Sequence, residues 1–262
     1  MHYSDFQHIT QTYDLICLSP HLDDAVLSCA GQLITARQAG LRTLVITVCT
    51  AVPGASTTYS DLAVEFHGEW GLSESEAVTT RLGEDRRAMA VLGADFVWLG
   101  LDDAIYRMPE HYFSRETLFA PPHPTDQLAT HLAPILRHLA QVTQAPRWLV
   151  PAGVGMHVDH LAVGDAVRQS LPPHLCAYYE ELPYALDADE INARRAMLPA
   201  HTVGNSDIGS VLAAKIAAIA CYASQMDALF KQGGHTMPPL VTAYHQHVGG
   251  GHPAECWYQL SV

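Results

Sequence analysis

The chain alternates between short apolar runs and longer segments whose apolar positions recur at helical spacing. The apolar runs predict strands at Tyr13–Ser19, Leu41–Thr50, Asp95–Leu99, Arg147–Val150 and Leu175–Tyr179. Between them, helical periodicity predicts helices at Val26–Ala39, Ser75–Leu92, Asp126–Gln144 and Val158–Gln169. This order predicts an α/β fold: a Rossmann-like, doubly wound, mostly parallel sheet with helices on both faces.

Three stretches lack clear periodicity. We expect a polar loop over about 51–71, an irregular loop over about 101–124 and a second irregular stretch at Lys231–Pro253. Loops of this length inside a compact domain are usually lids or walls of a functional site. The histidines of the last stretch are interpreted as solvated loop residues, with a flexible cover over a pocket as the alternative: His235, His245, His247 and His252.

The length of the chain is normal for one α/β domain. We therefore expect residues 1–262 to form a single domain, of which about 186–262 is the C-terminal part. In that part we expect a helix at Asp207–Ala223 and a final strand at Cys256–Val262 that lies at an edge of the sheet.

Charge and composition exclude several classes of partner. The formal net charge is −13, with 14 Lys plus Arg and no basic run, so neither nucleic acid nor an anionic membrane is an expected partner. The N-terminus is polar, and no segment is apolar enough for a membrane helix. The six cysteines have no C-x-x-C spacing and are interpreted as reduced core residues. We therefore expect a cytoplasmic protein that acts on a small molecule. A homo-oligomer is compatible with the sequence.

Metal-ligand side chains gather in two loops that directly follow predicted strands. Parallel strands bring such loops to the same edge of a sheet, where open α/β folds bind their ligands. In each loop two of these residues are three positions apart at the start of a helix, so that they can face one pocket. The residues are His21, Asp23, Asp24, His157, Asp159 and His160. Two histidines and an aspartate with open positions favour a catalytic metal site over a structural one.

Each loop also has a structural interpretation, because Asp23 or Asp24 could cap a helix and a histidine near a helix start is often incidental. Among enzymes, a non-haem Fe(II) oxygenase is the main alternative, since two histidines and a carboxylate also describe its metal site. A non-catalytic zinc-binding protein is a second alternative. A dinucleotide enzyme is not indicated, because the first strand-to-helix turn has no Gly-x-Gly.

The two loops resemble a known family. His21-Leu-Asp-Asp24 and His157-Val-Asp-His160 are similar to the H-x-D-D and H-x-D-H motifs of the LmbE-like, or PIG-L, zinc-dependent N-deacetylases. Ser19–Ser28 is particularly similar to the branch that contains the glycopeptide-antibiotic pseudoaglycone deacetylases. The similarity extends over roughly residues 13–185. This sequence departs from the more common His-Pro-Asp-Asp-Glu pattern at Leu22 and Ala25, and residues after about 186 match only loosely.

The resemblance implies a site and a reaction. His21, Asp24 and His160 would hold Zn²⁺, although the same ligands accept Fe²⁺ or another divalent ion. Asp23 would be the general base, and His157, held by the Asp159 carboxylate, could carry a positive charge and stabilise an oxyanion.

The resemblance also implies substrate contacts. Arg81 and Asp103 match positions that contact substrate in the family, with a surface helix charge and a loop aspartate as their structural alternatives. The expected reaction is removal of an N-acyl group, foremost N-acetyl, from an amino sugar such as N-acetylglucosamine or from a similar amine conjugate. Either Asp23 or His157 would protonate the leaving amine.

Overall fold

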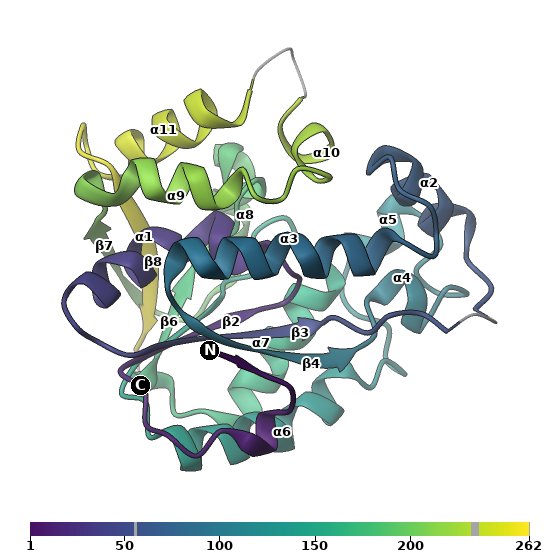
Figure 1. Cartoon of the computed structure of the whole chain (residues 1–262), viewed down its shortest axis with the longest axis horizontal. Helices are drawn as coiled ribbons and strands as arrows, with labels where there is room; N and C mark the ends of the chain where they lie inside the picture. The colour runs from purple at the N-terminus through teal and green to yellow at the C-terminus, as the bar shows by residue number, and fades with distance from the viewer. Residues whose placement is uncertain (55–56, 232–235, 262) are drawn as a thin grey trace.

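The computed structural model describes residues 1–54, 57–231 and 236–261, and its centre is one mixed sheet of eight strands (Figure 1). The strand order is β1-β4-β3-β2-β5-β6-β8-β7. All neighbouring pairs from β1 to β6 are parallel, whereas β8 runs antiparallel to both β6 and β7. The strands are β1 (His2–Tyr3), β2 (Leu15–Ser19), β3 (Thr43–Cys49), β4 (Asp95–Leu101), β5 (Trp148–Pro151), β6 (Cys176–Tyr179), β7 (His201–Asp207) and β8 (Ala254–Leu260).

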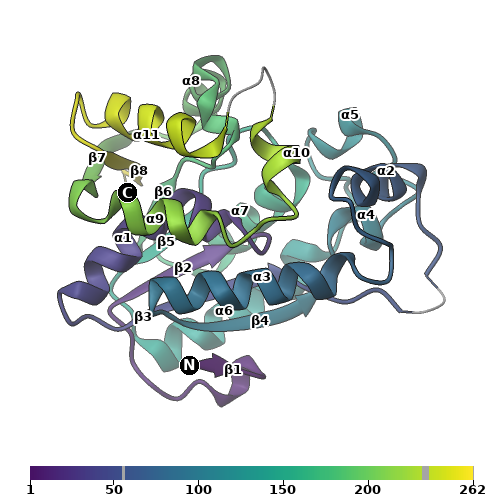
Figure 2. The same ribbon diagram turned by 45° about the horizontal axis from the view of Figure 1, so that its top comes forward.

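Helices cover both faces of this sheet, as predicted. One face carries α6 (Leu128–Thr143) and α7 (Val158–Ser170), and the other carries α1 (Asp24–Gln38) and α3 (Ala77–Leu92) (Figures 1 and 2). A further layer packs on α1 and α3: α9 (Leu212–Ile219) contacts both, and α11 (Met237–Val248) lies on α9 and β8. The strands β2, β3 and β5 are buried along their whole length, which explains their continuous Val, Ile and Leu runs.

The stretches without periodicity contain short helices that the sequence pattern did not predict. The polar loop contains α2 (Asp61–Glu69), and the irregular loop contains α4 (Ala104–Arg107) and α5 (Arg115–Leu118). These three elements form a separate layer beside the end of α3 (Figure 2). A smaller apolar cluster holds this layer together, with Leu62 of α2, Ile105 of α4 and Leu118 of α5 among its buried members.

The C-terminal part differs most from the predictions. The stretch Lys231–Pro253 is largely the helix α11, in which His245 is buried, so its interpretation as a loop was wrong; His235 lies outside the described residues. The final strand is not at an edge, because β7 pairs with its outer side. The helix predicted at Asp207–Ala223 is shorter in the structure, where α9 covers Leu212–Ile219. The sequence pattern did not predict α8 (Ala188–Met197), α10 (Met226–Phe230) or the strands β1 and β7.

Candidate metal centre

The two motif loops meet where the strand order of the sheet reverses. From β2 the chain adds β3 and β4 on one side, and then returns to place β5 and β6 on the other side of β2. The loops after β2 and β5 therefore leave adjacent parallel strands at the same edge. A crevice at such a switch point is the usual ligand site of open α/β sheets.

Hydrogen bonds from Ser19 shape the first loop. Its hydroxyl donates to the His21 carbonyl at 2.6 Å and accepts the Ala25 N–H at 2.9 Å. One carboxylate oxygen of Asp24, Oδ2, accepts the backbone N–H of His21 at 2.8 Å. The Asp23 side chain makes no capping hydrogen bond to α1, although Asp23 stands at the N-cap position. Because Asp23 does not cap the helix, its carboxylate is available for the site.

Glycines and a buried glutamate shape the second loop. Gly155 has a φ of +80°, and a Cβ there would come within 2.5 Å of the Tyr184 ring, so a larger residue would not fit. Glu181, which follows β6, accepts the backbone N–H groups of Gly153 at 2.5 Å and Val154 at 3.0 Å. The same carboxylate contacts Nδ1 of His160 at 3.3 Å. Glu181 thus orients His160 so that its other nitrogen, Nε2, faces the first loop.

Two imidazoles and a carboxylate converge where the loops meet. Oδ2 of Asp24 lies 3.3 Å from Nδ1 of His21 and 3.3 Å from Nε2 of His160. Within the part of the chain that the structure describes, this buried Nε2 has no hydrogen-bond partner. An unpaired imidazole nitrogen beside a carboxylate and a second imidazole fits a divalent metal ion, since histidine and aspartate are common ligands of Zn²⁺ and Fe²⁺.

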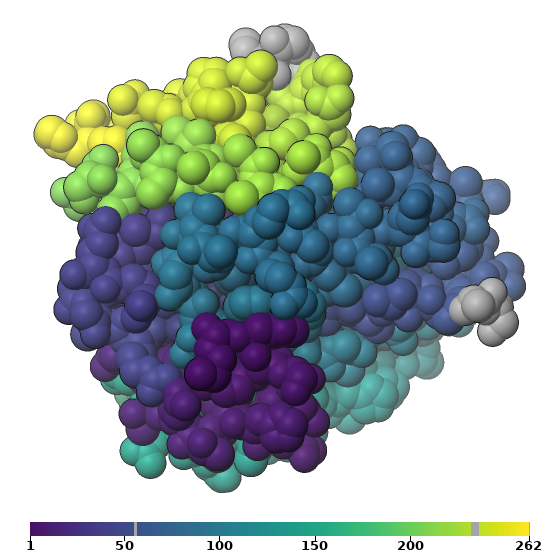
Figure 3. Space-filling view, in the orientation of Figure 1, coloured from purple at the N-terminus to yellow at the C-terminus, as the bar shows by residue number. Residues whose placement is uncertain are grey.

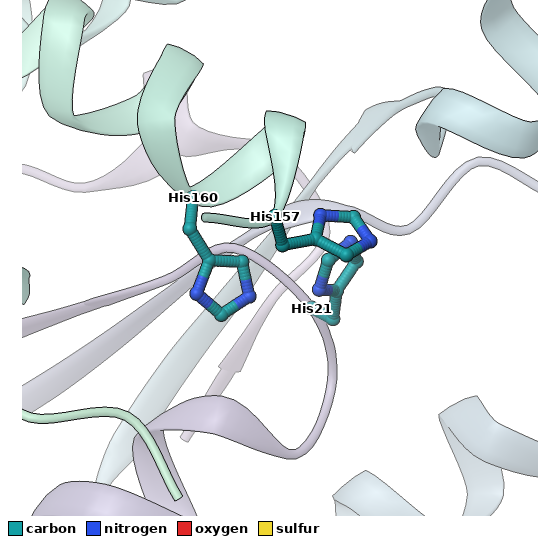
Figure 4. A group of neighbouring side chains, drawn as sticks. All are labelled: His21, His157 and His160. Carbon is teal, nitrogen blue, oxygen red and sulfur yellow. The ribbon is translucent and has the colours of Figure 1, made fainter. Parts of the chain in front are cut away.

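A third histidine lies beside this group. His157 is the N-cap of α7, and its ring lies 4.8 Å from that of His21 between centroids. His21, His157 and His160 present nitrogen atoms within 4.8 Å of one another, and Figure 4 shows the three side chains gathered at the start of α7. His157 therefore lies near enough to act on a group that the other residues bind.

The buried charges of this group stabilise one another. Burial alone would raise the pKa of Asp24, but the neighbouring His160 and His21 hold it well below its usual value. Burial lowers the pKa of His160, but Asp24 and Glu181 more than compensate and raise it to about 9. In a metal-free protein the site therefore retains protons, and a metal ion would displace them.

Asp23 and Arg81 form a second pair at the site. Nη2 of Arg81 lies 3.5 Å from Oδ1 of Asp23, and the guanidinium stacks on the Trp70 ring at 4.9 Å. Burial raises the pKa of Asp23, an effect that Arg81 partly opposes. Asp23 and Arg81 both line the cavity described below, as expected for residues that contact a bound molecule.

The Asp159 carboxylate contacts His21 rather than His157, which differs from the prediction. Its Oδ2 lies 3.1 Å from Nε2 of His21, and its Oδ1 accepts a 2.7 Å hydrogen bond from Arg107. Arg107 and the Ala104 N–H, both on α4, hold this carboxylate in place. Asp103 caps α4 through a hydrogen bond from Ile105, and its Oδ2 lies 3.5 Å from the same nitrogen of His21.

The surroundings of His157 in the metal-free site favour a neutral imidazole. Burial and the positive charge of His21 lower its pKa well below the usual value. Its Nδ1 accepts the backbone N–H of Asp159 at 3.2 Å. The proton of a neutral ring is then on Nε2, so His157 can still donate a hydrogen bond.

A cavity of about 790 Å³ opens above these residues. The site residues form its floor: His21, Asp23, Asp24, Arg81, Asp103 and His157. Its sides are mostly apolar and come from two regions, with Phe66 and Trp70 on one side and Leu229, Phe230 and Leu240 on the other. The space-filling view shows these two regions side by side, the C-terminal layer over α3 and the α2 region next to it (Figure 3).

Two residues at the centre were missed in the sequence. Glu181 is the second residue after β6, so the rule that singled out the two motif loops, to inspect the loops that follow parallel strands, also points to it. Arg107 lies in the irregular loop and carries no local signal of its contact with Asp159.

A comparison with protein-family models shows to which family the chain belongs. The family model described as "PIG-L: GlcNAc-PI de-N-acetylase" matches residues 16–171, a range that contains both motif loops. The chain belongs to the PIG-L family. It is therefore an enzyme of a deacetylase family, as its motifs indicated.

Individual PIG-L relatives agree with this assignment. A 2'-N-acetylparomamine deacetylase of Streptomyces fradiae is 31% identical over 218 residues, which are 81% of this chain and 73% of that protein. A deacetylase from the biosynthesis pathway of teicoplanin has a TM-score of 0.77 at 26% identity, covering 95% of this chain and 97% of its own. The A40926 pseudoaglycone deacetylase has a TM-score of 0.74 at 25% identity, covering 95% of this chain and 99% of its own.

Among the described residues, no helix is long and apolar enough to cross a membrane.

Proposed function

We propose that this PIG-L protein is a metal-dependent N-deacetylase that hydrolyses the amide bond of an N-acetylated amino sugar or a similar amine conjugate. The observation that carries the proposal is the convergence of Asp24 Oδ2 with His21 Nδ1 and His160 Nε2, at 3.3 Å each, at a cavity whose floor includes His21 and Asp24. The relatives support the substrate class, because their names describe deacetylases of 2'-N-acetylparomamine and of antibiotic pseudoaglycones.

His21, Asp24 and His160 would hold the metal ion, with Zn²⁺ as the favoured ion and Fe²⁺ as the ion that the same ligands accept. When bound, such an ion lowers the pKa of a water molecule and polarises the acyl carbonyl group. Glu181 fixes the ring of His160 for this task, and the Asp159 carboxylate does the same for His21.

The neighbouring residues supply the acid–base chemistry. Asp23 lines the cavity beside the ligands and takes up the proton of the attacking water. His157 donates the hydrogen of Nε2 to the acyl oxygen as negative charge develops there. Asp23 then returns its proton to the leaving amine, and Arg81 and Asp103 bind polar groups of the sugar at the edge of the floor.

Acetate release tests the proposal. Protein freed of metal with a chelator and then loaded with zinc or iron is incubated with N-acetylglucosamine conjugates and 2'-N-acetylparomamine, and acetate is measured. We expect release that depends on the added metal. Metal-loaded protein that releases no acetate from any acylated amine would contradict the proposal. Iron-bound protein that consumes oxygen with 2-oxoglutarate would instead favour the oxygenase alternative.

A further inference from the structure

The irregular loop reaches the metal centre through Arg107, the last residue of α4. Nη2 of Arg107 donates to Oδ1 of Asp159 and to Oδ2 of Asp126, both at 2.7 Å. Its Nε donates to Oδ1 of Asp126 at 3.0 Å, and Nη1 donates to the Asp102 carbonyl at 2.6 Å. The guanidinium thus bridges two buried carboxylates and a carbonyl, and its orientation is determined on three sides.

Asp126 is held just as firmly. It accepts hydrogen bonds from the Tyr112 hydroxyl at 2.7 Å and from the Leu128 N–H at 2.9 Å, in addition to those of Arg107. Asp126 lies just before α6, far in sequence from both motifs. The loop and the start of α6 therefore fix Arg107, and Arg107 fixes the Asp159 carboxylate.

The Asp159 carboxylate orients the ring of His21. Its Oδ2 lies 3.1 Å from Nε2 of His21, and an oxygen of Asp103 lies 3.5 Å from the same nitrogen. A carboxylate only accepts hydrogen bonds, so Nε2 donates to Asp159; when a metal ion takes the place of a proton on Nδ1, the one remaining ring proton is on Nε2. That Nδ1 faces the shared oxygen of Asp24 at 3.3 Å, where the metal ion is proposed to bind.

We propose that Arg107 is a positioning residue of the metal centre: it holds Asp159 so that His21 keeps its proton on Nε2 and presents Nδ1 to the metal. The metal affinity of the site is then controlled from the irregular loop, outside both motifs. This role rests on the proposed metal site, so the test must distinguish a failure of the role of Arg107 from a failure of the metal site itself.

Zinc affinity and the protonation of His21 provide that test. We compare wild type, Arg107→Lys and Asp126→Asn by competition with a chromophoric zinc chelator, and we read the protonated ring nitrogen from ¹⁵N shifts of ¹⁵N-histidine-labelled, zinc-loaded protein. Lysine keeps the charge but cannot bridge Asp159 and Asp126 together. We expect the zinc Kd of Arg107→Lys to rise about 10- to 100-fold, as for other residues that orient metal ligands.

For Asp126→Asn we expect a smaller rise in the zinc Kd, and in both variants a larger fraction of His21 with the proton on Nδ1. The matched control is Arg42→Lys, which alters an ion pair with Asp95 at the start of β4, the strand end away from the motif loops. Its zinc Kd should equal that of wild type.

The outcomes are distinguishable. If the variants lose thermal stability but keep the wild-type zinc Kd and the Nε2 proton, Arg107 has a structural role only and the inference is overturned. If Arg107→Lys does not fold, Asp126→Asn decides by the same two measurements. Wild-type protein without any zinc affinity would overturn the proposed function and, with it, the role of Arg107.

Discussion

The floor and the C-terminal wall of the cavity are built by different means. The floor consists of buried charged side chains in the loops after parallel strands, where hydrogen bonds and ion pairs determine each orientation. The C-terminal wall, formed by Leu229, Phe230 and Leu240 together with Leu186, consists of apolar side chains on helical segments. A polar network tolerates little change, because a lost partner leaves a buried charge, whereas an apolar wall can change its shape more gradually. We therefore expect the floor to determine the chemistry and the wall to determine the substrate.

The largest expected effect is on the floor, at Asp23. In Asp23→Asn the side chain keeps its size but cannot take up a proton, and we expect kcat for acetate release to fall about 10²- to 10⁴-fold. Zinc content should stay at the wild-type level. The control is Asp102→Asn, an exposed residue nearby whose side chain does not line the cavity. Wild-type turnover in Asp23→Asn would exclude Asp23 as the base.

The next effect is on metal binding, at Glu181. Both carboxylate oxygens of Glu181 accept hydrogen bonds from the loop N–H groups, and one of them contacts His160. A glutamine has only one oxygen that can accept, so His160 loses its orientation. We expect the zinc Kd of Glu181→Gln to rise about 10- to 100-fold. Glu180→Gln is the matched control, since Glu180 is a buried neighbour that contacts Tyr244 and Arg195 instead. Equal zinc Kd values in both variants would show that Glu181 does not support the metal.

A smaller effect is expected on the wall. Leu186 is 38% exposed and lines the cavity, so Leu186→Ala removes apolar contact area without opening the core. For a substrate with an apolar group we expect KM to rise about threefold while kcat is kept. Val203→Ala, which shortens an exposed side chain outside the cavity, should leave KM unchanged. A fall in kcat instead of a rise in KM would mean that the wall also positions the reacting amide.

The smallest expected effect is on stability, at a buried contact between α3 and the C-terminal layer. Asp85 of α3 accepts hydrogen bonds from Tyr222 of the C-terminal layer and from Trp98, both at 2.7 Å. Burial raises the pKa of Asp85 to about 7, although these hydrogen bonds oppose the rise. In the unfolded chain an aspartate has a pKa of about 3.9.

Between these two pKa values the folded state binds the additional proton, so the contribution of Asp85 to stability is lost as the pH rises towards 7. We expect the stability of Asp85→Asn to depend less on pH than that of wild type. The free energy of unfolding of the variant minus that of wild type should be larger at pH 8 than at pH 5 by about 1 kcal/mol or more. Urea denaturation at both pH values measures this difference. The same pH dependence in both proteins would show that Asp85 is ionised throughout.

The same division explains how far the sequence could predict the molecule. The strands β2, β3 and β5 were predictable because both of their faces are buried, and their loops could be assigned to one edge by topology alone. In contrast, α8 has no buried residue and therefore no periodic pattern. The strand β7 reads as a loop because it contains Gly204, Asn205 and Ser206; it is a strand through its pairing with β8, with Trp257 packed closely over Gly204.

The main error in the C-terminal part is the stretch Lys231–Pro253, which was interpreted as irregular. Pro238 and Pro239 do not prevent a helix there, because they occupy the first turn of α11, where a missing N–H removes no helical hydrogen bond. In the site, His21, Asp24 and His160 were identified as candidates by their spacing, whereas the direction of the Asp159 carboxylate depends on Arg107 and could not be predicted.

The position of β8 has a consequence for the order in which the protein is completed during synthesis. Within the described part of the chain β7 pairs with β8 alone, so β7 cannot join the sheet until residues 254–260 have left the ribosome. Tyr244 and Tyr258, both late in the chain, donate hydrogen bonds to Glu180, the neighbour of Glu181. The nascent parallel sheet can assemble early, as N-terminal parts of a chain usually do. The antiparallel side of the sheet is then completed last, so a ribosome-bound chain that lacks β8 should have its strands β2 to β5 in place but not yet β7.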